Sequence, residues 1–119
     1  MLERVRMKST FETPSAGAIE FKARVFKVLG DSNRIRILEF LRDGEKCQCE
    51  IIPMLGQAQP TVSRHLSLLE EAGLIQLRRD GNKIFYKTVD RRVYGIIDAM
   101  DSDLLGALSQ GLMSRLIPV

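Results

Sequence analysis

The segment that most constrains the fold of this 119-residue chain is residues 60–89, where a helical pattern is followed at once by a hairpin pattern. In "QPTVSRHLSLLEEAG" the apolar residues Val62, Leu66 and Leu69 are spaced i, i+4 and i+7, which places them on one face of an α-helix. The next segments, "LIQLRR" and "KIFYKTV", flank "DGN", a turn sequence typical of a β-hairpin. These residues therefore predict a core-packed helix beside a two-stranded hairpin.

Three helices are predicted before this unit. They are expected over residues 14–29, 31–44 and 49–55. Thr13 is the expected N-cap of the first helix, and Asp31 or Ser32 that of the second. The third should begin near Cys49, because a proline such as Pro53 is accommodated only near the start of a helix.

A single long helix is predicted after the hairpin, over residues 91–116. Its apolar face is formed by Val93, Ile97, Met100, Leu104, Leu108 and Leu112. The predicted fold is mainly α with a small β-hairpin, a winged helix-turn-helix. We expect one domain over residues 14–116, with an N-terminal arm at 1–13 and a tail at 117–119.

The composition points to an anionic partner and gives no support to an enzyme. The net charge is +3, and basic residues gather around the predicted hairpin, namely Arg78, Arg79, Lys83, Lys87, Arg91 and Arg92. The sequence contains no glycine-rich phosphate loop, no Ser/His/Asp set and no metal-hydrolase motif. It also has no apolar run near 18 residues and no secretory signal, so we expect a cytoplasmic protein without a membrane partner.

Over residues 26–90 the chain closely resembles the ArsR/SmtB family of dimeric repressors. The specific part of the resemblance is "QPTVSRHLSLLEEAGLI" followed by "RRDGNKIFYK". The resemblance implies a homodimer formed by the first and last helices, 14–29 and 91–116. It also implies that residues 31–90 read a pseudo-palindromic site on double-stranded DNA.

The candidate DNA-binding residues lie on the polar face of the helix at 60–71 and at the hairpin tip. They are Gln59, Thr61, Ser63, Arg64, His65, Ser67, Arg78, Arg79, Asn82 and Lys83. Arginine can bind guanine through two hydrogen bonds, glutamine can bind adenine, and the hairpin side chains suit backbone or minor-groove contacts. His65 stands at the edge of this face, so packing against the core is an equal alternative. A winged helix that docks only proteins is another alternative.

The two cysteines of the chain, Cys47 and Cys49, are separated by one residue in "KCQCE". In a regular helix residues i and i+2 point about 200° apart, whereas in an extended lead-in they point the same way and can share one ion. A position just before a helix also favours the thiolate form. Three alternatives stay open: a site for a soft ion, a thiol redox switch, and two ordinary residues.

The resemblance supports the first alternative, because arsenic- and cadmium-type members carry Cys-x-Cys at this place. It implies arsenite, cadmium or zinc as the bound ion. Two departures weaken the match: Ile52 occupies the place of a third cysteine found in arsenic-type members, and His65 is the only histidine of the chain. The zinc site that some members build from histidines of the last helix is therefore not expected.

Overall fold

The computed structural model describes residues 15–116, which form six helices and three short strands. Their order is α2 (Ala16–Leu29), α3 (Ser32–Phe40), β1 (Lys46–Cys47), α4 (Gln48–Leu55), α5 (Gln59–Glu71), β2 (Ile75–Asp80), β3 (Lys83–Thr88), α6 (Arg92–Asp98) and α7 (Ser102–Leu116). The expected arm at 1–13, with the cap Thr13, and the tail at 117–119 lie outside the described residues.

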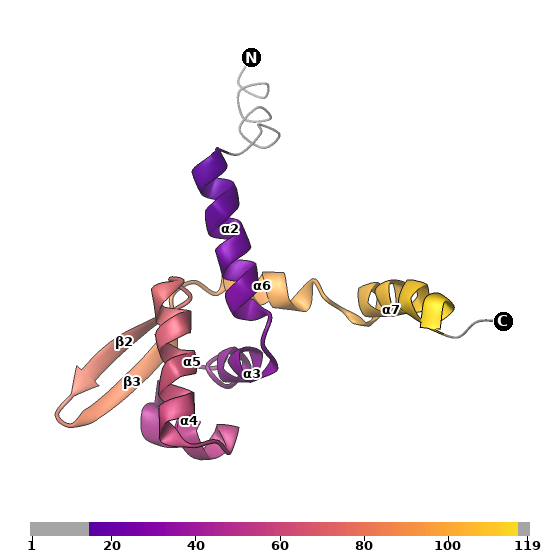
Figure 1. The fold of residues 1–119 in the computed structure, drawn as a ribbon. Helices are drawn as coiled ribbons and strands as arrows, with labels where there is room; N and C mark the ends of the chain where they lie inside the picture. Colours follow the sequence, from indigo (N-terminus) through magenta and orange to yellow (C-terminus); the bar gives the residue numbers. More distant parts are fainter. Residues whose placement is uncertain (1–14, 117–119) are drawn as a thin grey trace.

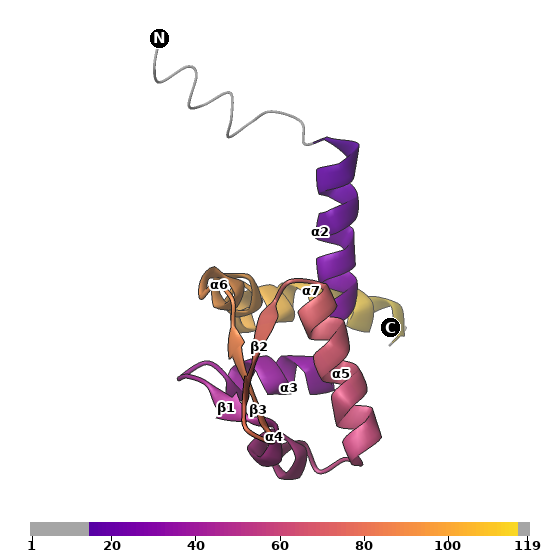
Figure 2. The same cartoon turned by 90° about the vertical axis from the view of Figure 1, so that its left-hand side faces the viewer.

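Helices α3, α4 and α5 and the β2–β3 hairpin form a compact unit, from which α2 and α7 extend in different directions (Figure 1, Figure 2). The radius of gyration is 18.2 Å, whereas a compact domain of this size has about 13 Å. Helices α3 to α5 followed by a hairpin are the arrangement of a winged helix-turn-helix, and α5 occupies the place of its recognition helix.

The core lies among α3, α4, α5 and the start of the hairpin. Its most completely buried side chains belong to Ile37, Leu38, Ile51, Val62, Leu66 and Leu69. The predicted inner face of α5 is therefore confirmed. No helix in the described part of the chain is both long enough and apolar enough to cross a bilayer.

The hairpin forms as predicted and gains a third strand. Strands β2 and β3 are antiparallel, with Asp80 opposite Lys83, and Gly81 takes the positive φ of +63° that the tight turn requires. Strand β1 adds to the other side of β3, with Cys47 opposite Phe85, so the sheet order is β1-β3-β2. The sequence did not indicate β1, because two residues carry no readable alternation.

Several helix boundaries differ from the predicted ones. Helix α2 begins at Ala16, where the Ser15 hydroxyl accepts a hydrogen bond from the Ala18 amide at 3.1 Å. Helix α3 has the expected cap Asp31, but it ends at Phe40, before Gly44, because residues 41–44 turn toward β1. Helix α4 begins at Gln48 and holds its proline in the second turn.

The predicted long helix over 91–116 is wrong, because the chain breaks between α6 and α7. The Asp101 carboxylate accepts a hydrogen bond from the Leu104 amide at 2.9 Å and so starts a new helix. Local capping at "DSD" thus overrides a continuous apolar pattern. A short loop thus separates α6 from α7 (Figure 1).

Candidate DNA-reading groove and cysteine pair

Helix α5 presents a polar face outward because its apolar face is buried. The side chains of Gln59, Thr61, Arg64 and Ser67 are exposed, and Ser63 is half-buried. Pro60 lies in the first turn, where a missing N–H is tolerated. The structure therefore leaves four of the candidate base-reading residues open to solvent.

His65 does not share that surface. Its side chain is 8% exposed, and its Nδ1 lies 3.3 Å from Nη1 of Arg34. Arg34 in turn donates through Nε to the carbonyl of Val28 at 2.6 Å, so the imidazole joins α5 to the ends of α2 and α3. Its burial fits the packing alternative, and we leave His65 out of the proposed base readers.

A groove of about 590 Å³ runs between the recognition helix, the start of α4 and the hairpin. Its polar lining includes Gln48, Gln59, Ser63, Ser67, Arg79, Asn82 and Lys83. Cys47 and Cys49 line the same groove. Six of the predicted DNA-reading residues thus share one surface with the predicted sensor residues, and we call this surface the reading groove. Arg64 lines a separate pocket together with Arg24 and Arg34.

Arg78 has a different environment from its neighbour Arg79. Its guanidinium donates two hydrogen bonds to the Glu45 carboxylate, at 3.0 and 2.8 Å, and stacks over the Phe85 ring at 4.6 Å. The hydrogen bonds from Arg78 hold the pKa of Glu45 below its usual value. Arg78 therefore braces the hairpin against the loop before β1, while Arg79 lines the reading groove.

Part of the remaining basic run is also neutralised locally. Arg92 donates to the Asp90 carboxylate at 2.7 Å, which lowers the pKa of Asp90 to about 2. Arg91 donates to the carbonyl of Arg42 at 2.7 Å. The net positive charge that this basic run presents at the surface is therefore smaller than the sequence suggests. Arg79 and Lys83 supply the cations of the reading groove.

The cysteine pair has a geometry that is neither of the two expected ones. Cys47 is extended and is the N-cap of α4, and its sulfur accepts a hydrogen bond from the Cys49 amide at 3.1 Å. The Glu50 carboxylate accepts from the Cys47 amide at 2.9 Å and completes a capping box. A capping side chain folds back over the first turn, so it meets the side chain of Cys49 there.

The two sulfur atoms are paired in the structure, and the Cα atoms of Cys47 and Cys49 are 5.0 Å apart. Cys47 is 4% exposed and Cys49 is exposed, so the pair is open to the groove on one side. Among residues 15–116 no group of three His, Cys, Asp or Glu side chains is placed to hold a metal. Two sulfurs suit a soft ion, and its other ligands would be water or an added thiol.

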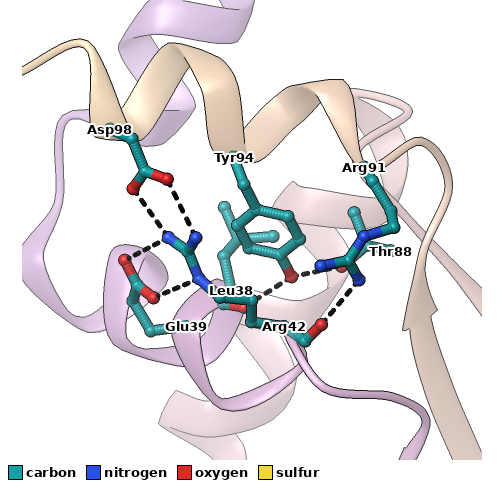
Figure 3. A network of polar contacts seen from close by, with 7 residues as sticks. All are labelled: Leu38, Glu39, Arg42, Thr88, Arg91, Tyr94 and Asp98. Carbon is teal, nitrogen blue, oxygen red and sulfur yellow. Dashed lines mark hydrogen bonds and ion pairs between the residues drawn. The ribbon is translucent and has the colours of Figure 1, made fainter.

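A polar network absent from the sequence-based expectations joins α3 to α6 (Figure 3). The Arg42 guanidinium donates to the carboxylates of Glu39 and Asp98 and lies 4.5 Å above the Tyr94 ring. The Arg42 hydrogen bonds lower the pKa of Asp98, and burial raises the pKa of Tyr94. Because Arg42 and Asp98 are 56 residues apart, no local pattern reveals their contact.

The fold and the open face of α5 beside its hairpin define a winged helix-turn-helix DNA-binding regulator. The sequence profile described as "Bacterial regulatory protein, arsR family" matches residues 31–76. The uncharacterized HTH-type transcriptional regulator MJ1325 of Methanocaldococcus jannaschii is 43% identical over 83 residues, which are 69% of this chain and 93% of that protein. The chain belongs to the ArsR family of transcriptional regulators.

Other relatives are named for resistance to toxic elements. The probable mercury resistance operon repressor of Streptomyces lividans is 40% identical, over 63% of this chain and 60% of its own length. The arsenic resistance transcriptional regulator ArsR1 of Pseudomonas putida is 41% identical, over 63% of this chain and 65% of its own length. The chain thus spans less than two thirds of both regulators.

Among solved structures, Rv0081 of Mycobacterium tuberculosis is similar to this chain with a TM-score of 0.65 and 28% identity. The likeness covers 87% of this chain and all of Rv0081. The structural likeness thus extends beyond the residues matched by the family profile.

Proposed function

We propose that the chain is a homodimeric, sequence-specific DNA-binding repressor, controlled by a thiophilic metal or metalloid ion at Cys47 and Cys49. The observation that carries the proposal is that the sulfur pair lines the same groove as Ser63 and Arg79. An ion at the sulfurs is therefore next to the DNA-reading surface. A coupling of about 1–3 kcal/mol, or roughly 5–150-fold in DNA affinity, is common for such regulators.

The exposed apolar side chains of α2, α6 and α7, and of Met100 between the last two helices, support the dimer. They include Ile19, Phe21, Phe26, Ile96, Met100, Leu104, Leu105, Leu108 and Leu112, each at least 40% exposed in the single chain. A surface of this extent on an isolated soluble chain is typical of an interface. A two-fold dimer presents two α5 helices, which fits a pseudo-palindromic operator.

On α5, we assign base contacts to Gln59, Ser63 and Ser67, which line the groove, and to Thr61 and Arg64, which are exposed outside it. The hairpin residues Arg79, Asn82 and Lys83 contact the DNA backbone or minor groove. Arg78 contributes mainly by holding the hairpin in place through Glu45. This division follows from exposure and from the partners that each side chain already has.

The number of sulfur ligands, two, restricts which ions the cysteine pair can hold without further ligands. Arsenite, cadmium and zinc prefer three or four ligands, so each needs water or an added thiol beside the two sulfurs. A mercuric ion is satisfied by two thiolates, and one relative is named as a probable mercury resistance repressor. The proposal assumes a cytoplasmic location, where the thiols are kept reduced.

A thiol switch is the second candidate, and the pairing of the two sulfurs favours it. A peroxide would oxidise one thiolate to a sulfenic acid with release of hydroxide or water. The second thiol would then displace water to form the disulfide, and a dithiol would reduce it again. The same residues thus serve either ion binding or oxidation, and only an experiment separates them.

The test begins by selecting an operator from random duplex DNA. Binding isotherms of the reduced protein are then recorded alone and with arsenite, cadmium, zinc, mercuric ion or peroxide. Release by an ion while both thiols stay unoxidised supports the metal or metalloid sensor. Release by peroxide alone, reversed by a dithiol, supports the redox switch. A chain that selects no sequence is not a sequence-specific repressor.

A further inference from the structure

We propose that Gln48 is the positioning residue that passes the state of the cysteine pair to the recognition helix. Gln48 is the single residue between Cys47 and Cys49, and its Nε2 donates a hydrogen bond to Oγ of Ser63 at 3.2 Å. Both side chains are half-buried at the reading groove. The inference rests on the proposed control of DNA binding by these cysteines and adds the route by which it acts.

The covalent arrangement makes Gln48 sensitive to anything that joins the two sulfurs. An ion or a bond between the sulfurs closes a ring that runs through the backbone of Gln48. Closing this ring restricts φ and ψ at Gln48, and these dihedral angles set the direction of its side chain. Occupancy of the pair is therefore translated first into the position of the Gln48 amide.

The other end of the contact is on the helix that reads DNA. Ser63 lies beside Arg64 and on the same groove-facing side as Gln59 and Ser67. The apolar contacts between α4 and α5 are made by fully buried residues such as Ile51 and Leu66, which hold both helices to the core. The amide–hydroxyl contact is half-exposed, so it can exchange for water when Gln48 turns.

The hydrogen bond is present while the two sulfurs are paired, so the joined pair holds the Gln48 amide on Ser63. Opening the pair frees the amide, which removes this restraint on Ser63 and changes how α5 meets the DNA. The route needs no movement of the hydrophobic core. This route also explains how the cysteine pair, which lines the groove, can change DNA binding without blocking the groove. Polar side chains are the movable part of this interface because the apolar part is close-packed.

The test compares Gln48→Leu, which removes the amide at similar size, with the parent. Two quantities are measured: the affinity of arsenite and cadmium for the reduced protein, followed by sulfur-to-ion absorbance, and the ratio of operator Kd with and without each ion. We expect ion affinity within twofold of the parent and a Kd ratio at least threefold smaller. Gln76→Leu, an exposed glutamine of β2 outside the groove, should leave both quantities unchanged.

A double-variant cycle separates this route from general damage. Ser63→Ala should also reduce the Kd ratio. Adding Gln48→Leu to it should reduce the ratio no further, because both substitutions remove the same hydrogen bond. An additive effect of the two changes contradicts the inference. A Gln48→Leu variant whose Kd ratio equals that of the parent also contradicts it. A Gln48→Leu variant that no longer binds the ion contradicts it as well, because Gln48 would then be part of the ion site. A parent that binds an ion without any change in operator affinity overturns the proposed sensor and this inference with it.

Discussion

The Tyr94 hydroxyl donates a hydrogen bond of 2.6 Å to the main-chain carbonyl of Leu38, which joins α6 to the last turn of α3 (Figure 3). The Thr88 hydroxyl, at the end of β3, lies 2.6 Å from the same oxygen. Because Tyr94 donates to the carbonyl, Thr88 is the donor in the second bond. One buried phenol oxygen thus ties together the core, the end of the hairpin and the segment leading to α7.

Tyr94→Phe should lower the free energy of unfolding by about 1–3 kcal/mol, because it removes both hydrogen bonds of the buried Tyr94 hydroxyl and leaves the Leu38 carbonyl with only the Leu41 amide. Urea unfolding followed by circular dichroism measures this change. Tyr86→Phe is the matched control, since Tyr86 is also buried but takes no part in this network. Equal losses in the two variants would show that the Tyr94 hydroxyl has no special role.

Asp31 caps α3 by accepting hydrogen bonds from the amides of Asn33 at 2.8 Å and Arg34 at 3.3 Å. Burial alone would raise the pKa of Asp31, but these amides hold it below the usual value of 3.8. Its stabilising effect is therefore complete above about pH 4 and is lost as the pH falls through the lowered pKa. Asp31→Asn should keep the cap and flatten the pH dependence of stability below about pH 4.

Asp31→Ala should cost about 0.5–2 kcal/mol at neutral pH, as loss of an N-cap does. Urea unfolding at several pH values tests both substitutions. If Asp31→Asn shows the same acid dependence as the parent, another carboxylate is responsible.

The parts of the fold that follow from local pattern were predictable. The inner face of α5, the Gly81 turn and the Asp31 cap each depend on residues close together in sequence. The break at Asp101 was missed because the apolar spacing continues across it, and only the capping geometry reveals it. The contacts of Tyr94 with Leu38 and of Arg42 with Asp98 could not be predicted from local pattern, because the two residues of each pair are 56 positions apart.

For the candidate site, residue type and helical position were enough to find the exposed face of α5. They did not indicate that Arg78 is paired with a carboxylate whereas Arg79 lines the groove, because the pairing of Arg78 with Glu45 depends on how the loop before β1 folds back. The cysteine geometry was not predictable either, since cysteine is not among the residue types that are typical of an N-cap. Sequence thus located the site, while side-chain pairing determined which members are available to a ligand.

Arg79→Ala should weaken binding to operator and to random duplex alike, and it should reduce the salt dependence of log K by about one charge. The reason is that Arg79 lines the reading groove as a cation of the hairpin. Titrations at several salt concentrations measure both effects. Arg78→Ala is the neighbouring control and should have the smaller salt effect, because Arg78 is paired with Glu45. A larger salt effect for Arg78 would reverse the assignment.

Leu108→Glu should convert the dimer to a monomer at micromolar concentration. Leu108 is 55% exposed on the apolar side of α7, and a buried, unpaired carboxylate opposes association. Sedimentation equilibrium gives the mass directly. Gln110→Glu adds the same charge to the other side of α7 and should remain dimeric. A parent with the mass of one chain would contradict the proposed dimer itself.

The most direct test of the account is the operator affinity of the parent and of Cys47→Ser/Cys49→Ser, each measured with and without saturating arsenite, cadmium or mercuric ion. Thiol titration in every sample verifies that the parent stays reduced. The account predicts that at least one ion weakens binding by the parent about 5–150-fold. It predicts that the double variant binds DNA as the ion-free parent does and ignores every ion. A double variant that responds as the parent does would contradict the central claim, since control of DNA binding would then not depend on Cys47 and Cys49.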